Sequence, residues 1–127
     1  MRLVLIRHAE SAPGTPDELR ELTPEGFEQA RSLGERLRAE GVRPDTVLSS
    51  PLLRARQTAE TLGFGEPEAD DRLAPGATPE AVREAIAERG ETVVVVGHQP
   101  DCGRVAASLS GGDEPRFAPA GVAVIHL

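Results

Sequence analysis

The chain has 127 residues and a formal net charge of −7, and it contains three Phe but neither Tyr nor Trp. Such an acidic chain repels nucleic acid and anionic membranes, and it has few aromatic side chains on which bases could stack. Its length predicts one domain over residues 1–127, with a core that needs no disulfide or metal. Cys102 is the only cysteine, which excludes an intrachain disulfide and a cysteine-rich zinc site. No stretch is typical of a secretion signal or a membrane span, so we expect a cytoplasmic monomer.

The first third of the chain predicts a strand, a loop and a long helix. Residues 2–7 are an apolar run typical of a buried strand, and a loop rich in Pro and Gly follows it. Thr23 and Pro24 predict a helix start, because Thr caps a helix well and Pro suits its first turn. The helix is expected to reach about Glu40 and to stop at Gly41. Apolar residues recur in it at helical spacing: Phe27, Ala30, Leu33 and Leu37.

The middle of the chain repeats this order. Residues 45–49 predict a second short strand. Ser50 and Pro51 repeat the helix-start signal, and the helix is expected to end at Gly63. Residues 64–78 are rich in Gly, Pro and acids, which favours a loop with at most a short strand.

The last part of the chain completes an α/β pattern. A weakly apolar helix from Thr78 to about Gly90 is expected at the rim of the fold. Residues 92–96 are unbroken and β-branched, which indicates a central strand. A fourth helix over 100–109 and a final strand over 121–127 follow. The alternation predicts a three-layer α/β sandwich, with a mostly parallel central sheet and helices on both faces.

Polar side chains follow three of the predicted strands. His8 and His98 each come just after an apolar strand, and Arg54 lies in the first turn of the helix that follows another. In open α/β sheets, ligands bind beyond the carboxyl ends of the strands, where helix N-termini also offer free N–H groups. We therefore expect these residues and Arg7 to line one crevice. Guanidinium and imidazole groups suit a phosphoryl group, and a neutral imidazole is a good nucleophile near pH 7.

The same residues stand in an ordered set of motifs that covers nearly the whole chain. The motifs are R-H-A-E at 7–10, R-x-L-T-P-x-G at 20–26, S-P-x-x-R-A-x-Q-T at 50–58 and V-x-x-V-G-H-x-P at 93–100. Together they resemble the histidine phosphatase (phosphoglycerate mutase-like) superfamily. With the short length, they look like its SixA-type phosphohistidine phosphatase branch. The resemblance implies a phosphoglycerate mutase-like fold and a phosphatase that needs no metal and no other cofactor.

The resemblance also implies roles for individual residues. His8 would be the nucleophile that becomes phosphorylated, and water would then release phosphate from it. The phosphoryl oxygens would be held by Arg7, Arg54 and His98. Arg20 and Ser50 would bind the substrate.

Three departures from the family pattern bear on the substrate. Ala9 stands where the family usually has Gly, which would cost about 1 kcal/mol if that residue needed a positive φ. An Asn of the mutase-type members is missing from the first loop. The general acid is not evident either. The candidates are Glu10, Asp71 and Asp101, and the loop that holds Asp71 contains the further acids Glu66, Glu68 and Asp70.

The weak signal for a general acid favours phosphohistidine on a signalling protein as the substrate. An alkyl alcohol needs a proton to leave, and a positioned acid supplies roughly 10²- to 10⁴-fold in rate. A phosphohistidine releases imidazole, which leaves more easily. Residues 59–91 are also too few for a helical lid, so an open pocket is expected. The alternatives are a small-molecule phosphomonoesterase and a catalytically weak module that binds phosphate or a phosphopeptide.

Cys102 and His126 are of types that often act in active sites, but the sequence does not favour such a role for either. Cys102 lies at a predicted helix start, where a thiolate would be favoured. The C-x₅-R loop of cysteine phosphatases is absent, so we do not expect a cysteine nucleophile. His126 lies in the terminal strand and is expected to be structural.

Overall fold

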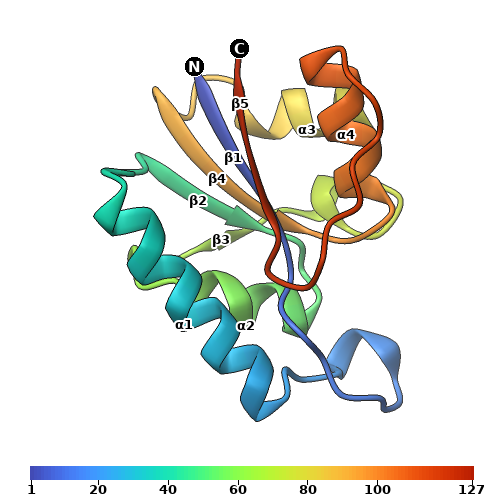
Figure 1. Cartoon of the computed structure of the whole chain (residues 1–127). Coiled ribbons are helices and arrows are strands. Elements are labelled where there is room, and N and C mark those ends of the chain that lie inside the picture. Colours follow the sequence, from blue (N-terminus) through green and yellow to red (C-terminus); the bar gives the residue numbers. More distant parts are fainter.

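A five-stranded sheet in the order β3-β2-β4-β1-β5 forms the centre of the computed structural model, which describes all 127 residues (Figure 1). Neighbouring strands are parallel except for β5, which runs antiparallel to β1. The strands are β1 (Arg2–Arg7), β2 (Thr46–Ser49), β3 (Glu68–Ala69), β4 (Thr92–Gly97) and β5 (Val122–His126). The predicted mostly parallel sheet is confirmed, with β4 in its centre.

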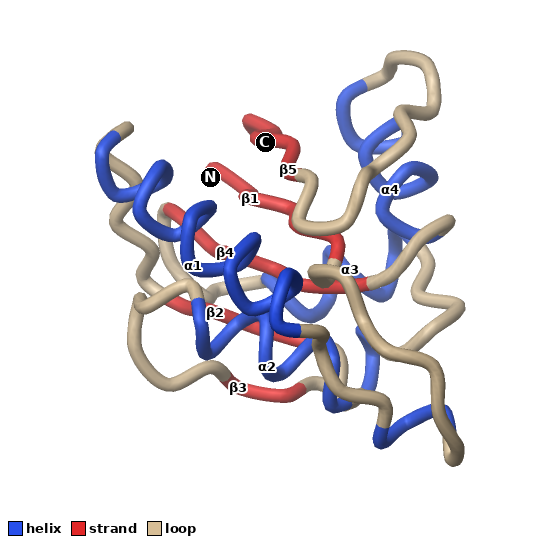
Figure 2. Tube along the Cα trace, turned by 60° about the horizontal axis from the view of Figure 1, so that its bottom comes forward, coloured by secondary structure: helices blue, strands red, loops and turns tan.

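Helices cover both faces of this sheet, as Figure 2 shows from a second direction. On one face lie α1 (Pro24–Ala39) and α2 (Leu53–Thr61), and on the other lie α3 (Pro79–Ile86) and α4 (Asp101–Ser110). The three-layer α/β sandwich is therefore confirmed. None of the helices combines the length and the apolar character that crossing a membrane would require.

The two faces of the sheet hold separate parts of the core. In β1, Val4 and Ile6 pack with α1 and α2, whereas Leu3 and Leu5 pack with α3 and α4. Successive side chains of a strand point to opposite faces, so a strand covered on both sides must be apolar at every position. This explains the unbroken apolar runs of β1 and β4, and it places the ends of both strands at the edge of a rigid core.

The prediction for α3 was wrong in two respects. The helix ends at Ile86 instead of near Gly90. It does not lie at the rim, because Val82, Ala85 and Ile86 are buried in the same cluster as β1 and β4. Three apolar residues on one side of a short helix are enough to bury it, although its overall composition is only weakly apolar.

The start of α2 and one residue of α1 also differ from the prediction. The regular part of α2 begins at Leu53, so Ser50 lies before the helix and does not cap it. In α1 the predicted cap is confirmed, since Thr23 Oγ1 accepts a hydrogen bond from Gly26 N at 2.9 Å. Phe27 shares the helical spacing of the buried residues of α1 but remains 38% exposed.

Candidate active site

Two neighbouring strands bring His8 and His98 together. β1 and β4 are parallel and paired in register up to Arg7 and Gly97, and each histidine directly follows the last of these pairs. His8 N donates a hydrogen bond to Gly97 O at 2.9 Å, which extends the ladder by one residue. The two imidazole rings lie with their centroids 5.2 Å apart. Residues 90 positions apart in the sequence thus meet because their strands are adjacent in the sheet.

The two rings lie in an open cleft of about 400 Å³. The cleft is lined mainly by polar groups and carries three guanidiniums. Its lining consists of Arg7, His8, Ala9, Glu10, Ser11, Arg20, Arg54, Pro75, His98, Gln99 and Pro119. Sequence reasoning named the histidines, the arginines and Glu10 as site residues. It did not assign Ser11 or Gln99 to the site, although Gln99 directly follows His98, and it missed Pro75 and Pro119, which come from loops without a chemical signature.

The ring of His8 is held in one orientation by its own backbone. His8 Nδ1 lies 2.7 Å from Ala9 O, and because a carbonyl oxygen only accepts, Nδ1 must carry the proton. Nε2 therefore carries the lone pair. Burial lowers the pKa of His8 from 6.5 to about 4, and the positive charges of Arg54 and Arg7 add to this against the opposing effect of the Ala9 bond. At pH 7 the ring is neutral and has a free nitrogen lone pair.

Ala9 fits its position without strain. It is fully buried, and it is not among the residues with a positive φ, so the expected cost of replacing Gly does not arise. Ala9 N donates to Thr58 Oγ1 at 3.0 Å, and the Thr58 hydroxyl donates to Arg54 O at 2.8 Å. This pair of bonds ties the end of β1 to the first turn of α2. These bonds therefore fix the position of His8 relative to Arg54.

His98 is hydrogen-bonded through its Nε2, whereas His8 is hydrogen-bonded through its Nδ1. Its Nε2 lies 2.8 Å from Ser50 Oγ, and this serine is fully buried. The sequence reasoning assigned Ser50 to substrate binding, but the residue does not line the cleft. Burial, together with the neighbouring His8 and Arg54, lowers the pKa of His98 from 6.5 to about 3. This ring is also neutral at pH 7.

Arg7 and Arg54 approach the cleft from different elements. Arg54 comes from the first turn of α2 and is only 7% exposed. Its Nη1 donates to Asp17 O at 2.9 Å, and its Nη2 donates to a carboxylate oxygen of Asp17 at 3.3 Å. Arg7 ends β1, and its Nη1 donates to Phe117 O at 2.9 Å. Backbone carbonyls thus orient both guanidiniums.

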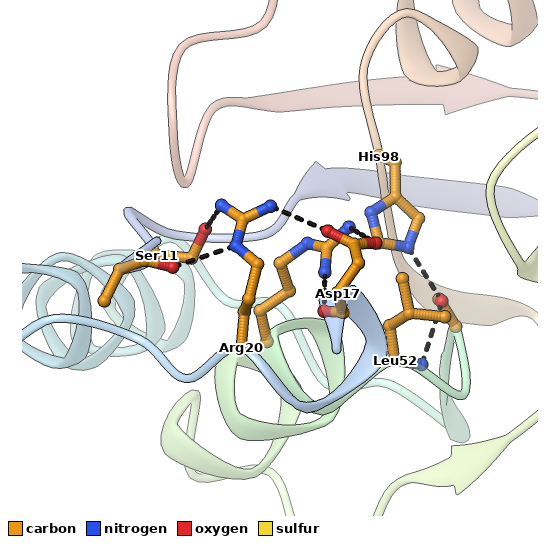
Figure 3. A network of polar contacts seen from close by, with 8 residues as sticks. Ser11, Asp17, Arg20, Leu52 and His98 are labelled. Atoms are coloured by element: carbon orange, nitrogen blue, oxygen red, sulfur yellow. Dashed lines mark hydrogen bonds and ion pairs between the residues drawn. The ribbon is translucent and has the colours of Figure 1, made fainter. Parts of the chain in front are cut away.

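The third guanidinium, that of Arg20, belongs to the exposed loop between β1 and α1. It donates to Ala12 O, Ser11 Oγ and Asp17 Oδ1, each at 2.9 Å (Figure 3). The hydrogen bond from Arg20, with the positive charge of Arg54, lowers the pKa of Asp17 below its usual value. Sequence reasoning missed Asp17. The available signal was an Asp three residues before Arg20 in a loop already assigned to the site.

The structure separates the three candidate acids. Glu10 lines the cleft, and its side chain is exposed. Asp71 does not line it. Asp101 is buried at the start of α4 and accepts a hydrogen bond from Gly76 N at 2.7 Å, which holds the loop that carries Pro75. Of the three candidates, only Glu10 therefore lines the cleft.

Cys102 and His126 do not line the cleft. Cys102 is buried, and burial raises the pKa of its thiol to about 12, so the expected thiolate character at the helix start was wrong. His126 pairs with Arg2, at the opposite end of the sheet from the cleft, and is exposed.

Comparisons with known proteins agree with this geometry. The family model of the histidine phosphatase superfamily (branch 1) matches residues 3–75. Phosphohistidine phosphatase SixA of Escherichia coli is 31% identical over 139 residues, and the match covers 100% of this chain and 86% of that protein. The uncharacterized protein Rv1276c of Mycobacterium tuberculosis is 36% identical over 137 residues, with 96% and 87% covered.

Solved structures give the same result. The protein histidine phosphatase SixA complexed with tungstate superimposes with a TM-score of 0.92 at 29% identity, covering 100% of this chain and 88% of that one. A putative phosphohistidine phosphatase SixA from Nakamurella multipartitia gives a TM-score of 0.84 at 30% identity, with 97% and 82% covered. The chain belongs to the histidine phosphatase superfamily and is a phosphatase. Within that superfamily it falls in the SixA-type branch.

Proposed function

We propose that this phosphatase removes the phosphoryl group from phosphohistidine on a protein, through a covalent phosphohistidine at His8 and without a metal ion. The observation that carries the proposal is the pair of neutral rings in one arginine-lined cleft. His8 has a free lone pair on Nε2, whereas a protonated imidazole could not attack phosphorus. Its low pKa keeps this form dominant at neutral pH.

The proposed reaction has two displacements at phosphorus. In the first, the Nε2 lone pair of His8 forms an N–P bond, the P–N bond of the substrate breaks, and the leaving imidazole takes up a proton. In the second, water attacks the phosphoryl group on His8, the N–P bond breaks, and inorganic phosphate leaves. The sum is the hydrolysis of phosphohistidine to histidine and phosphate, with His8 restored.

The positive charge around His8 matches the negative charge that the phosphoryl oxygens carry in such a reaction. Arg7, Arg20 and Arg54 offer planar guanidiniums, which bind phosphoryl oxygens through paired N–H donors. His98 stands beside the nucleophile and can donate an N–H to an equatorial oxygen. Because backbone carbonyls and Ser50 already orient these donors, little reorganisation is needed as the transition state forms.

The donor set supports chemistry that does not depend on a metal. No three side chains of the His, Cys, Asp and Glu types lie close enough together to hold an ion. Positive charge in the cleft comes instead from guanidiniums. We expect EDTA to leave the rate unchanged, and strong inhibition that Mg²⁺ or Zn²⁺ reverses would contradict this part of the proposal.

The open shape of the cleft supports a protein-borne phosphohistidine. The cleft is open to solvent, so a phosphorylated side chain can enter while the rest of its protein stays outside. The similar protein of Escherichia coli is named a phosphohistidine phosphatase. Glu10 is the one observation that favours the second candidate, a phosphomonoesterase for small molecules, because an acid at the cleft could protonate an alkoxide.

A competition between two leaving groups tests the proposal. A histidine peptide phosphorylated with phosphoramidate is compared with a phosphoserine peptide of the same sequence otherwise. We expect kcat/KM for the phosphohistidine peptide to be higher by at least about 100-fold, since imidazole needs less help to leave than an alkoxide. Equal values would favour the second candidate, and hydrolysis of phosphoserine alone would overturn the proposal.

A further inference from the structure

A buried serine contacts the ring of His98 and does not line the cleft. Ser50 follows β2, is fully buried, and has two hydrogen-bonding neighbours. Leu52 N donates to its Oγ at 3.2 Å, and His98 Nε2 lies 2.8 Å from the same oxygen. The adjacent Ser49 is equally buried, but its hydroxyl has no partner at all. Of these two fully buried serines, only Ser50 has hydrogen-bond partners for its hydroxyl.

The proton of the Ser50 hydroxyl has one available acceptor. A serine hydroxyl has one O–H donor and two acceptor lone pairs, and the N–H of Leu52 can only occupy a lone pair. If His98 Nε2 also donated to this oxygen, the buried O–H would be left without an acceptor, which costs about 1–3 kcal/mol. The hydroxyl therefore donates to His98 Nε2. A neutral ring that accepts at Nε2 carries its proton on Nδ1.

We infer that Ser50 is a positioning residue that fixes His98 in the Nδ1–H tautomer, so that the ring presents an N–H donor to the phosphoryl group in the cleft. The inference rests on the proposed role of His98. In Figure 3, the ring nitrogen that does not bond to the serine lies on the side of His98 that faces Asp17. The other tautomer would turn a lone pair toward the phosphoryl oxygens, which repels them.

The two histidines of the cleft then carry the same tautomer for opposite purposes. Ala9 O holds the proton on Nδ1 of His8, which leaves the Nε2 lone pair free for attack. Ser50 Oγ holds Nε2 of His98, which leaves its Nδ1 proton free for donation. A fixed donor beside a fixed nucleophile needs no proton transfer between the two rings before the reaction.

Nitrogen NMR of the free protein tests the inference without any substrate. The chain has three histidines, so ¹⁵N labelling of imidazole gives three ring systems, with the exposed His126 as an internal reference. We expect His98 to show the Nδ1–H pattern at pH 7, and Ser50→Ala to shift it toward the Nε2–H form that predominates in a free neutral histidine side chain. The same variant should lower kcat by roughly 10- to 100-fold with little change in KM.

Ser49→Ala is the matched control, since it removes the same atom from an equally buried site that has no hydrogen bond. It should leave both the tautomer and kcat unchanged, and Ser50→Thr, which keeps a hydroxyl, should retain the wild-type tautomer if Ser50→Ala does not fold. A wild-type His98 with its proton on Nε2 overturns the inference. So does a Ser50→Ala protein that loses activity with the tautomer unchanged, or an equal loss in Ser49→Ala. If the tautomer behaves as expected but phosphohistidine is not hydrolysed, the proposed function fails and the role of Ser50 in fixing the ring stands.

Discussion

The cleft has two walls that are built in different ways. One, the strand-end wall, consists of Arg7, His8 and His98 at the ends of β1 and β4. The other, the loop wall, is the segment before α1, in which Glu10 and Arg20 line the cleft and Asp17 bonds to Arg20. The histidines of the strand-end wall are buried, whereas the side chain of Asp17 in the loop wall is 60% exposed.

The difference assigns separate tasks to the two walls. Burial shifts the pKa values of both histidines far enough to keep the rings neutral, and that requires a rigid sheet edge. An exposed loop cannot shift pKa values in this way, but its charges can select which anion enters. Arg54 connects the walls, because it comes from buried α2 and bonds to Asp17 in the loop. We therefore expect the chemistry to depend on the strand-end wall and the selectivity to depend on the loop wall.

Apart from removal of the nucleophile, the largest effect is expected where the walls meet. Arg54→Lys should lower kcat/KM by about 10²- to 10³-fold, because lysine keeps the charge but loses the planar fork that binds two oxygens. Arg56→Lys, on the exposed side of the same helix, is the control and should change kcat/KM less than twofold. Steady-state kinetics with the phosphohistidine peptide measures both. A nearly normal Arg54→Lys enzyme would show that the two walls do not share a phosphoryl site.

A smaller and selective effect is expected for the carboxylate of the loop wall. Glu10→Gln should lower the rate with a phosphoserine peptide by roughly tenfold and leave the rate with phosphohistidine nearly unchanged, because only the alkoxide needs a proton to leave. Glu25→Gln, an exposed acid in the first turn of α1, serves as the control. The measurement is the ratio of the two kcat/KM values. An equal loss on both substrates would mean that Glu10 has a role that does not depend on the leaving group.

A weaker effect is expected for Asp17. Its carboxylate occupies guanidinium donors of Arg20 and Arg54 that face the cleft, and it repels an incoming dianion. Asp17→Asn should therefore tighten inhibition by inorganic phosphate by roughly two- to fivefold, with the modest size set by solvent exposure. Glu18→Gln, the exposed neighbour, should not change the inhibition constant. Weaker inhibition in Asp17→Asn would mean that the carboxylate orients the arginines more than it competes with phosphate.

The stability of the free protein tests the burial of the strand-end wall. The folded pKa values of about 4 for His8 and about 3 for His98 lie below the unfolded value of 6.5, so the unfolded chain binds more protons between these limits. The free energy of unfolding should therefore be fully retained above pH 6.5 and fall as the pH drops from 6.5 toward 4. Urea titrations across this range measure it. A His8→Gln, His98→Gln double variant should show a flatter dependence.

The features that sequence alone could predict are those encoded locally. Apolar runs and caps predicted the strands and α1, and a histidine just after an apolar run predicted a side chain at the sheet edge. What failed depends on tertiary partners. Ser50 meets His98 across 48 positions, and the burial of Cys102 comes from a core that local sequence does not show. Three apolar positions bury α3 although its composition predicted the rim. Asp17 was missed because a loop acid becomes informative only once its arginine partners are located.

The most direct test of the account is the site of the covalent intermediate. Rapid quenching of the enzyme with a ³²P-labelled phosphohistidine peptide, followed by mass mapping, should show a single adduct that is labile in acid, stable in base and located on His8. His8→Ala should give no adduct, and its rate should fall by at least about 10³-fold. Label on another residue, or full turnover by His8→Ala, would contradict the account.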